Sequence, residues 1–298
     1  MQILPVYILK KSPEPSETVR QIKQLSENCS LFSFTIVTVK MLLLFRRMCI
    51  SLISHPRLCL SMDPVISQIR KELKNQANSQ IRQSSQRFFK EEITCYGVKT
   101  ATVTKIAKKY WNEVKTQPKH KIFSLCEELY KSGFLEESFI VSNWTHALSG
   151  RYEREDYVIF RCWVDTYITN WAACDSFCNH TMGDFLDKYP EYIEDLKLWT
   201  KSPNRWMRRA AAVSLIIPAK KGMFLKDIIH LADLLLPDHD DMVQKGYGWL
   251  LKEASRKHQK EIFDYVMLHR KCMPRTALRY AIELMPKELK ADAMRKDR

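Results

Sequence analysis

Glycine is scarce in this sequence. The chain has seven glycines in 298 residues, about a third of the average frequency of about 7%. Glycine supplies the positive φ angles on which many tight turns depend, so this scarcity disfavours turn-rich β architectures. Because 45% of the residues are hydrophobic, the chain can still bury a sizeable core, and we expect an all-α fold.

Long hydrophobic segments are also missing. The apolar run from Leu31 to Phe45 contains Lys40 and is closed by Arg46 and Arg47. It is shorter than the about 20 apolar residues that span a bilayer. No short apolar region with a small-residue cleavage site stands near the start, as a secretory signal requires. The sequence therefore predicts no membrane partner.

Recognisable ligand motifs are lacking as well. The nine cysteines are odd in number and scattered, which favours a reducing intracellular compartment over a secreted disulfide framework. Cys174, Cys178 and His180 have no second Cys/His pair nearby, unlike a structural zinc site. Residues 238–241, Asp-His-Asp-Asp, are typical of a loop and a helix N-cap. Since there is no Walker loop, nucleophile elbow or dinucleotide fingerprint, we expect no metal and no cofactor.

Positive charge, in contrast, is in excess. The chain has 48 Lys and Arg against 34 Asp and Glu, which gives a net charge of +14. Eight basic and three acidic residues give residues 1–61 a charge of +5, which leaves +9 for residues 62–298. The charge on this longer part indicates a polyanionic partner.

The chain divides near Met62. Residues 12–16, Ser-Pro-Glu-Pro-Ser, have the composition of a loop, and we expect residues 1–61 to form a poorly ordered N-terminal extension. Asp63 is able to cap a helix and Pro64 suits its first turn. We therefore expect one domain over residues 62–298.

Glycine and proline divide residues 62–298 into segments of about ten to twenty residues, most of them with helical periodicity. The spacing is compatible with degenerate HEAT-like helical pairs of about 40 residues. The expected helices are 65–90, 100–114, 121–131, 136–148, 156–167, 171–179, 192–200, 204–217, 225–236, 240–255, 259–269, 275–284 and 287–295.

The expected helix 240–255 has two contrasting faces. Its apolar stripe is formed by Val243, Tyr247, Leu250 and Ala254. The opposite face carries Lys245, Trp249, Lys252 and Arg256. A tryptophan among basic residues either packs against a neighbouring helix or offers its ring to a sugar or base while the cations meet phosphates.

Two further segments carry candidate site residues. Asn170 is a suitable N-cap, and Trp171 and Asp175 lie one turn apart on the same helix face, either as a catalytic pair or as a core tryptophan with an aspartate at its edge. Arg209 falls within the stripe formed by Trp206, Ala210, Val213 and Ile217. A guanidinium in that place requires an anion, either an internal carboxylate or a nucleic-acid phosphate.

Together the three segments resemble a known family. Trp171-x-x-x-Asp175, Trp206-x-x-Arg209-Ala210-Ala211 and Gly248-Trp249-Leu250-Leu251-Lys252-Glu253, in that order and at those separations, resemble the AlkD-like DNA alkylation repair glycosylases. The resemblance covers residues 62–298 and leaves residues 1–61 unmatched. It implies an all-α, HEAT-like helical-repeat solenoid whose concave, basic face holds duplex DNA.

The resemblance also implies an activity and roles for single residues. Such proteins are monofunctional DNA glycosylases that hydrolyse the N-glycosidic bond of cationic N3- or N7-alkylated purines, and we expect a monomer. Trp171 and Trp249 would flank the deoxyribose, Asp175 would be the catalytic carboxylate, and Arg209 would hold DNA near the lesion. The other residues expected to bind DNA are Lys245, Lys252, Arg256, Phe88 and Trp206.

The sequence departs from the family pattern at two places. Phe88 stands where relatives often have a tyrosine near the lesion, and Ala172 stands where a further acidic residue often follows the first tryptophan. Asp175 is then the single carboxylate of its motif. Two alternatives stay open: a non-catalytic HEAT-repeat DNA-binding protein, and a protein-interaction scaffold with Trp249 as a hot spot for acidic partners.

Overall fold

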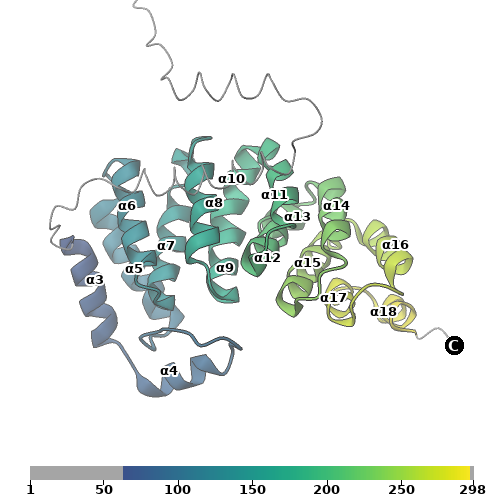
Figure 1. The fold of residues 1–298 in the computed structure, drawn as a ribbon, viewed down its shortest axis with the longest axis horizontal. Coiled ribbons are helices and arrows are strands. Elements are labelled where there is room, and N and C mark those ends of the chain that lie inside the picture. Colours follow the sequence, from purple (N-terminus) through teal and green to yellow (C-terminus); the bar gives the residue numbers. More distant parts are fainter. Residues whose placement is uncertain (1–62, 296–298) are drawn as a thin grey trace, which may run out of the picture. The chain divides into compact units, whose positions relative to one another are not determined.

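The computed structural model describes residues 63–295, and these residues form an all-α fold (Figure 1). Within this range the one β interaction is an isolated bridge between Thr94 and Phe134. The expected all-α class is therefore confirmed. The predicted N-terminal extension, residues 1–61, lies outside the described residues.

The helices follow one another at short intervals. They are α3 (Pro64–Asn75), α4 (Ser79–Gln86), α5 (Thr100–Val114), α6 (Lys119–Tyr130), α7 (Leu135–Ala147), α8 (Asp156–Tyr167), α9 (Trp171–Phe177), α10 (Gly183–Lys188), α11 (Ile193–Trp199), α12 (Arg205–Val213), α13 (Ile216–Lys221), α14 (Leu225–Leu235), α15 (Asp241–Ala254), α16 (Gln259–His269), α17 (Arg275–Ala281) and α18 (Lys287–Met294). Short irregular turns are η1 (Ser149–Arg151), η2 (Cys178–Met182) and η3 (Pro190–Tyr192).

Several local sequence signals act as predicted. The side chain of Asp63 accepts a hydrogen bond from the Val65 amide at 2.9 Å and caps α3, with Pro64 in the first turn. Asp240 likewise caps α15 by accepting from the Met242 amide at 2.8 Å. The predicted helices 100–114, 156–167 and 259–269 coincide with α5, α8 and α16. Capping and periodicity are local properties, and for this reason the sequence alone reveals them.

Two predicted helices are wrong because each is divided in the structure. The predicted helix 65–90 becomes α3 and α4, because Asn78 is extended, donates its amide to the Gly97 carbonyl at 3.1 Å and caps α4. The predicted helix 204–217 ends at Val213, and a new helix, α13, begins at Ile216. In α13 Pro218 lies in the first turn, where its missing amide hydrogen costs nothing.

A third predicted helix, 171–179, also differs. The α-helix α9 ends at Phe177, continues through the π-helical turn η2 and leads into α10, a helix that the sequence pattern did not predict. Gly183, which the sequence pattern treated as a helix breaker, is instead the first residue of α10. A Cβ atom added at this position would lie 3.4 Å from the Ser214 carbonyl oxygen.

Alternate helices form one continuous inner layer. The chain of contacts runs from α5 to α7, α9, α12, α15 and α17, which we call the inner helices, and α6, α11 and α14 pack against α7, α12 and α15 of this series. In Figure 1 the helical stack extends from α3 at the left to α18 at the right. The inner helices α9, α12 and α15 carry Trp171, Asp175, Arg209 and Trp249. Stacking therefore brings residues far apart in sequence onto neighbouring helices.

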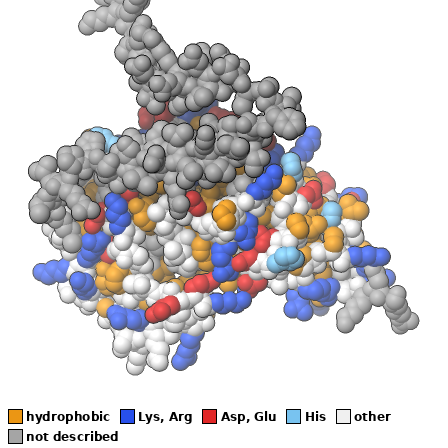
Figure 2. Space-filling model, viewed as in Figure 1, with side chains coloured by type: hydrophobic (Ala, Val, Ile, Leu, Met, Phe, Trp, Pro, Cys, Tyr) orange, Lys and Arg blue, Asp and Glu red, His pale blue; other side chains and the backbone are white. Residues whose placement is uncertain are grey.

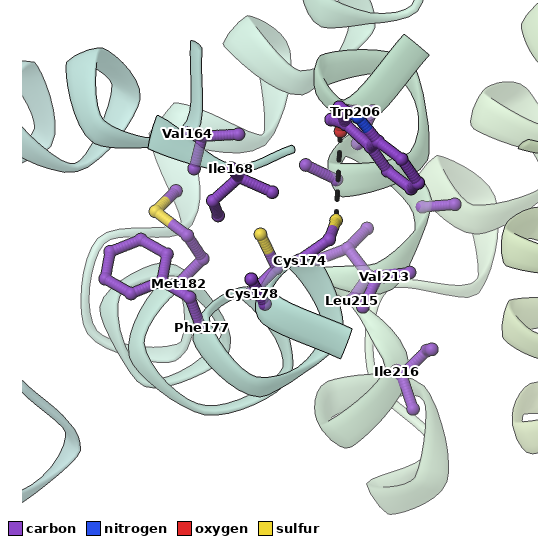
Figure 3. Close-up of a cluster of buried hydrophobic side chains, with 14 of the residues drawn as sticks. Val164, Ile168, Cys174, Phe177, Cys178, Met182, Trp206, Val213, Leu215 and Ile216 are labelled. Atoms are coloured by element: carbon purple, nitrogen blue, oxygen red, sulfur yellow. Dashed lines mark hydrogen bonds between the residues drawn. The ribbon is translucent and has the colours of Figure 1, made fainter. Parts of the chain in front are cut away.

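A hydrophobic core runs through this stack from Ile66 on α3 to Ala293 on α18. Figure 3 shows the part around α9 and η2, where Cys174 and Cys178 lie among Ile168, Phe177 and their neighbours. The Cys174 thiol donates to the Trp206 carbonyl at 3.8 Å and so links α9 to α12. Burial raises the pKa of the Cys174 thiol, and the residue acts as a small packing side chain.

Two buried carboxylates anchor the segment that leads into α5. Glu136 on α7 accepts hydrogen bonds from the backbone amides of Tyr96, Gly97 and Val98 at 3.0, 2.8 and 3.0 Å. Its neighbour Glu137 accepts from the Tyr96 hydroxyl at 2.7 Å and pairs with Arg70 at 3.1 Å. This segment is therefore fixed to α7 by charge-assisted hydrogen bonds.

Replacing Glu136 with alanine is expected to lower the free energy of unfolding by about 3 kcal/mol, because it leaves three buried amides without an acceptor. Urea denaturation monitored by circular dichroism measures this loss. The matched control is Glu191→Ala on η3, since Glu191 is exposed and pairs with exposed Arg154. Equal stability of the two variants would show that Glu136 does not anchor the segment.

Candidate active site

An aspartate and an arginine meet between two inner helices. Asn170 accepts from the Ala173 amide at 2.9 Å and begins α9, as predicted, which places Trp171 and Asp175 on one face. From α12, Arg209 donates through Nε to Asp175 Oδ1 at 2.9 Å and through Nη2 to Oδ2 at 2.8 Å. The structure thus assigns an internal carboxylate as the anion that the sequence required for Arg209.

Arg209 also contacts a third inner helix. Its Nη1 donates to the Met242 carbonyl in the first turn of α15. Gly246, one turn later, allows the close approach, because an added Cβ would lie 3.3 Å from Arg209 Cγ. One guanidinium therefore joins α9, α12 and α15. The sequence motifs did not include Gly246, although a glycine within a helix, three residues before Trp249, is a signal for close packing.

The pair is buried but not sealed. The side chain of Arg209 is 6% exposed and that of Asp175 is 16% exposed. Burial raises the pKa of the Asp175 carboxyl above its ordinary value, whereas the charge and hydrogen bonds of Arg209 act in the opposite direction. Asp175 therefore keeps a small exposed fraction beside the more deeply buried Arg209.

Trp171 is held by a segment that precedes it by more than eighty residues. Its indole Nε1 donates to the Phe88 carbonyl at 3.2 Å, and its ring stacks on that of Phe89, with centroids 5.2 Å apart. The Phe88 side chain itself is 74% exposed. The sequence directed attention to Phe88 and missed Phe89, whose ring makes the contact with Trp171.

Trp249 is half-buried on α15, and its indole nitrogen donates to Glu253 Oε1 at 3.4 Å. The expected basic face of this helix carries ion pairs. Lys245 pairs with Asp241 at 3.3 Å, Lys252 with Glu283 at 2.7 Å and Arg256 with Glu253 at 2.6 Å. These cations are therefore locally compensated. Figure 2 likewise shows basic and acidic side chains intermixed on the face in view.

The expected contact of Trp206 with DNA requires an exposed side chain, but the structure buries this residue. Its side chain is 6% exposed and belongs to the core, and the guanidinium of Arg205 lies 4.9 Å from the ring centroid. The residue therefore supports α12 from within. Its position in the apolar stripe of α12 was the signal for burial.

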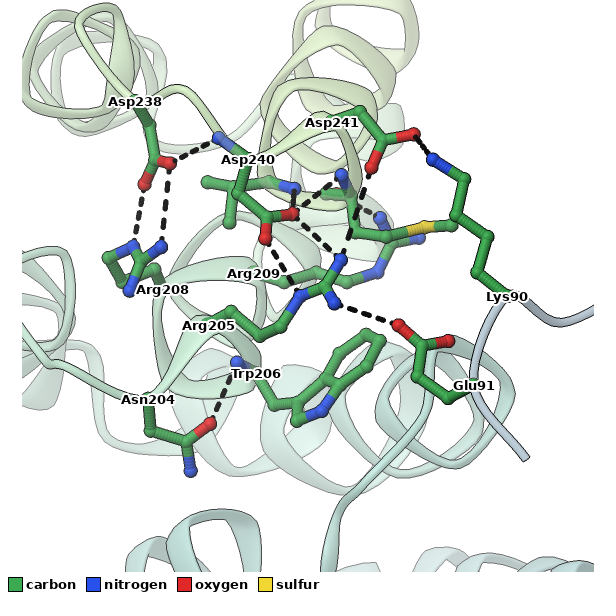
Figure 4. Close-up of polar contacts among 12 residues, drawn as sticks. Lys90, Glu91, Asn204, Arg205, Trp206, Arg208, Arg209, Asp238, Asp240 and Asp241 are labelled. Atoms are coloured by element: carbon green, nitrogen blue, oxygen red, sulfur yellow. Dashed lines mark hydrogen bonds and ion pairs between the residues drawn. The ribbon is translucent and has the colours of Figure 1, made fainter. Parts of the chain in front are cut away.

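Charged side chains form a network at the start of α12 and α15 (Figure 4). Arg205 pairs with Glu91 at 2.7 Å and with Asp240 at 2.8 Å. Arg208 pairs with Asp238 at 2.6 Å, and Lys90 pairs with Asp241 at 2.7 Å. The predicted loop and N-cap at residues 238–241 thus also bind cations from α12 and from the segment after α4.

Candidate metal ligands are dispersed in the part of the chain that the structure describes. Within residues 63–295 no three His, Cys, Asp or Glu side chains come together in an arrangement suited to a metal ion. No helix in the same range has the length and apolar character needed to cross a bilayer.

The stacked helical pairs with a continuous inner layer define a helical-repeat protein of the HEAT-like class. A family model described as "DNA alkylation repair enzyme" matches residues 69–285. The chain therefore belongs to the DNA alkylation repair enzyme family, as the sequence motifs indicated.

Two solved structures share the fold. A predicted DNA alkylation repair enzyme from Enterococcus faecalis is 17% identical in sequence and superposes with a TM-score of 0.64. The superposition covers 71% of this chain and 98% of the Enterococcus chain. AlkD2 from Streptococcus mutans is 18% identical, covers 75% of this chain and 99% of its own, with a TM-score of 0.52. Among curated proteins no sequence matches.

Replacing Arg209 with methionine is expected to lower the free energy of unfolding by about 3–5 kcal/mol, because it leaves the Asp175 charge buried without a partner. The double variant Asp175→Asn/Arg209→Met should lose about 1–3 kcal/mol less than the sum of the two single losses. Urea denaturation of all four proteins measures this coupling.

The exposed pair Lys260–Asp264 on α16, with an Nζ–Oδ2 distance of 2.6 Å, provides the matched control and should show no measurable coupling. Additive losses at Asp175 and Arg209 would contradict a stabilising role for their ion pair.

Proposed function

We propose that this protein is a monofunctional DNA glycosylase that hydrolyses the N-glycosidic bond of cationic N3- or N7-alkylated purines in duplex DNA. The observation that carries the proposal is the arrangement of Asp175 on the helix that carries Trp171. Arg209 on α12 holds its carboxylate and also bonds to the first turn of α15, the helix that carries Trp249. Membership of the DNA alkylation repair enzyme family supports action on DNA.

The chemistry of the substrate suits a site with a carboxylate. An alkylated purine that already bears a positive charge is a good leaving group, so no strong general acid is needed at the base. The remaining task is to stabilise an oxocarbenium-like sugar and to position water. An aspartate anion performs both, since it attracts the developing positive charge and accepts a hydrogen bond from the attacking water.

The neighbours of Asp175 support that role. The bidentate ion pair with Arg209 favours the ionised form and orients the carboxylate. Trp171 and Trp249 are half-buried, and in this proposal the exposed part of each residue meets the substrate. The electron-rich face of an indole favours a nearby cation, which here is the sugar of the transition state.

Duplex DNA is the proposed partner, bound by a monomer. Residues 62–298 have a net charge of +9, and Arg87, which directly precedes the residue that bonds to Trp171, is exposed. Contacts of lysine and arginine with phosphates supply affinity that does not depend on base sequence and that falls steeply with salt. Such binding places the duplex along the inner helices.

Asp175→Asn is expected to lower the rate of 7-methylguanine release by about 100-fold or more, because an amide cannot stabilise the cationic sugar. DNA binding should change little. Single-turnover excision from methylated duplex and a parallel fluorescence anisotropy titration measure the two quantities. The matched control is Asp187→Asn on α10, whose carboxylate pairs with Lys221 at 2.7 Å and should be dispensable.

Excision by Asp175→Asn at the wild-type rate would contradict the catalytic role. If that variant and the wild-type protein both bind methylated duplex and neither releases base, the protein is a non-catalytic DNA-binding protein.

The proposal also predicts a pH dependence. Asp175 must be ionised, so excision falls as the pH drops through the pKa of its carboxyl group. Burial raises this pKa, and the charge and hydrogen bonds of Arg209 act to lower it. In Arg209→Gln the opposing charge is removed, and the acid limb of the single-turnover rate should move to higher pH. Arg208→Gln is the control, because Arg208 pairs with Asp238 instead. A shift to lower pH, or equal shifts in both variants, would contradict this assignment.

A further inference from the structure

The linker between α4 and the bridge at Thr94, residues 87–93, contacts all three helices that carry the candidate site. It is closed at its base by Gln86, which donates through Nε2 to the Glu91 carbonyl at 2.8 Å and accepts from the Ile93 amide at 3.0 Å. The linker is therefore a loop whose backbone is closed by the side chain of the preceding residue.

On one side this loop holds Trp171. The Phe88 carbonyl accepts from the indole nitrogen and the Phe89 ring stacks on the indole. Phe89 and Ile93 also pack, together with Trp171, against the small buried cluster that includes Ala172, the next residue of α9. The linker thereby fixes both the position and the tilt of the Trp171 ring.

On the other side the loop is tied to α12 and α15. Glu91 Oε1 pairs with Arg205 Nη1 at 2.7 Å, and Arg205 in turn pairs with Asp240, the N-cap of α15. Figure 4 shows Glu91 and Lys90 reaching these two helices from one short stretch of backbone. Lys90 pairs with Asp241 on α15.

The two attachments differ in strength. The Lys90 side chain is 66% exposed, so its pair is screened by solvent and contributes little. The side chains of Glu91 and Arg205 are 28% and 31% exposed, and the second carboxylate oxygen of Glu91 is shielded from solvent. The Glu91–Arg205 pair is therefore the firmer attachment of the linker to the helices that carry Arg209 and Trp249.

We propose that Glu91 is a positioning residue for the reaction. Its ion pair with Arg205 ties the linker across α9, α12 and α15, and the linker then holds Trp171 in the orientation that stabilises the transition state. Glu91 touches neither substrate nor Asp175. This inference rests on the proposed glycosylase function for its effect on rate, whereas its effect on Trp171 does not depend on any activity.

The first test follows the indole proton of Trp171 by ¹⁵N–¹H NMR, with its signal assigned by its loss in Trp171→Phe. Glu91→Ala should release the linker and accelerate solvent exchange of this proton about tenfold or more, because the bond to the Phe88 carbonyl opens more often. The control is Glu92→Ala, an exposed neighbour on the same linker. Unchanged exchange in Glu91→Ala would overturn the proposal, whether or not the protein excises bases.

The second test is a kinetic cycle with saturating methylated duplex. Glu91→Ala should lower the single-turnover rate about tenfold with little change in the Kd for DNA, since misplacement of a catalytic group by about 1 Å is costly. In a Trp171→Ala background the same change should cost less than about twofold, because the two residues act through one contact. Glu91→Gln, which still accepts a hydrogen bond, should recover part of the rate.

The outcomes separate this inference from the proposed function. If the wild-type protein excises 7-methylguanine and Glu91→Ala costs the same in both backgrounds, Glu91 does not act through Trp171. If the wild-type protein excises nothing, the proposed function fails and the indole exchange alone decides whether Glu91 positions Trp171.

Discussion

The candidate site depends on the ion pair between Asp175 and Arg209. Two charges this well buried are tolerated only when each meets the other in good geometry. Arg209 satisfies that condition with a bidentate contact to Asp175 and a further bond to the Met242 carbonyl. Three inner helices are thereby held at fixed separations, and Gly246 permits the approach of the third. The same contact that stabilises the stack orients the carboxylate.

The net charge of this protein does not show which of its cations are free to bind a polyanion, because many of them pair with carboxylates. The excess of Lys and Arg indicates a polyanionic partner, yet Lys245, Lys252 and Arg256 on α15 each pair with a carboxylate. A duplex that binds this helix competes with those carboxylates. We therefore expect much of the affinity for DNA to come from exposed cations such as Arg87 and from the balance of charge over the whole inner layer.

The linker of residues 87–93, together with the segment just beyond it, joins the candidate site to α7 and α12. Glu136 fixes the segment just beyond it to α7, and Glu91 ties the linker itself to α12. Between these two anchors Phe89 meets the ring of Trp171. The first described helices therefore contribute to a site whose principal residues lie much later in the chain.

The sequence by itself determined the local features. Periodicity located most helices, Asn170 marked the start of α9, and the four-residue spacing placed Trp171 and Asp175 on one face. It also required an anion for Arg209, because a guanidinium within an apolar stripe cannot stay unpaired.

Only the tertiary structure decided that this anion is Asp175, that Trp206 is buried, that Phe89 stacks on Trp171 and that Glu91 pairs with Arg205. The break between α3 and α4 belongs to the same group, since Asn78 is extended by its bond to the Gly97 carbonyl. Each of these features depends on contacts between residues distant in sequence, whereas caps and helical spacing depend on neighbours within a turn or two.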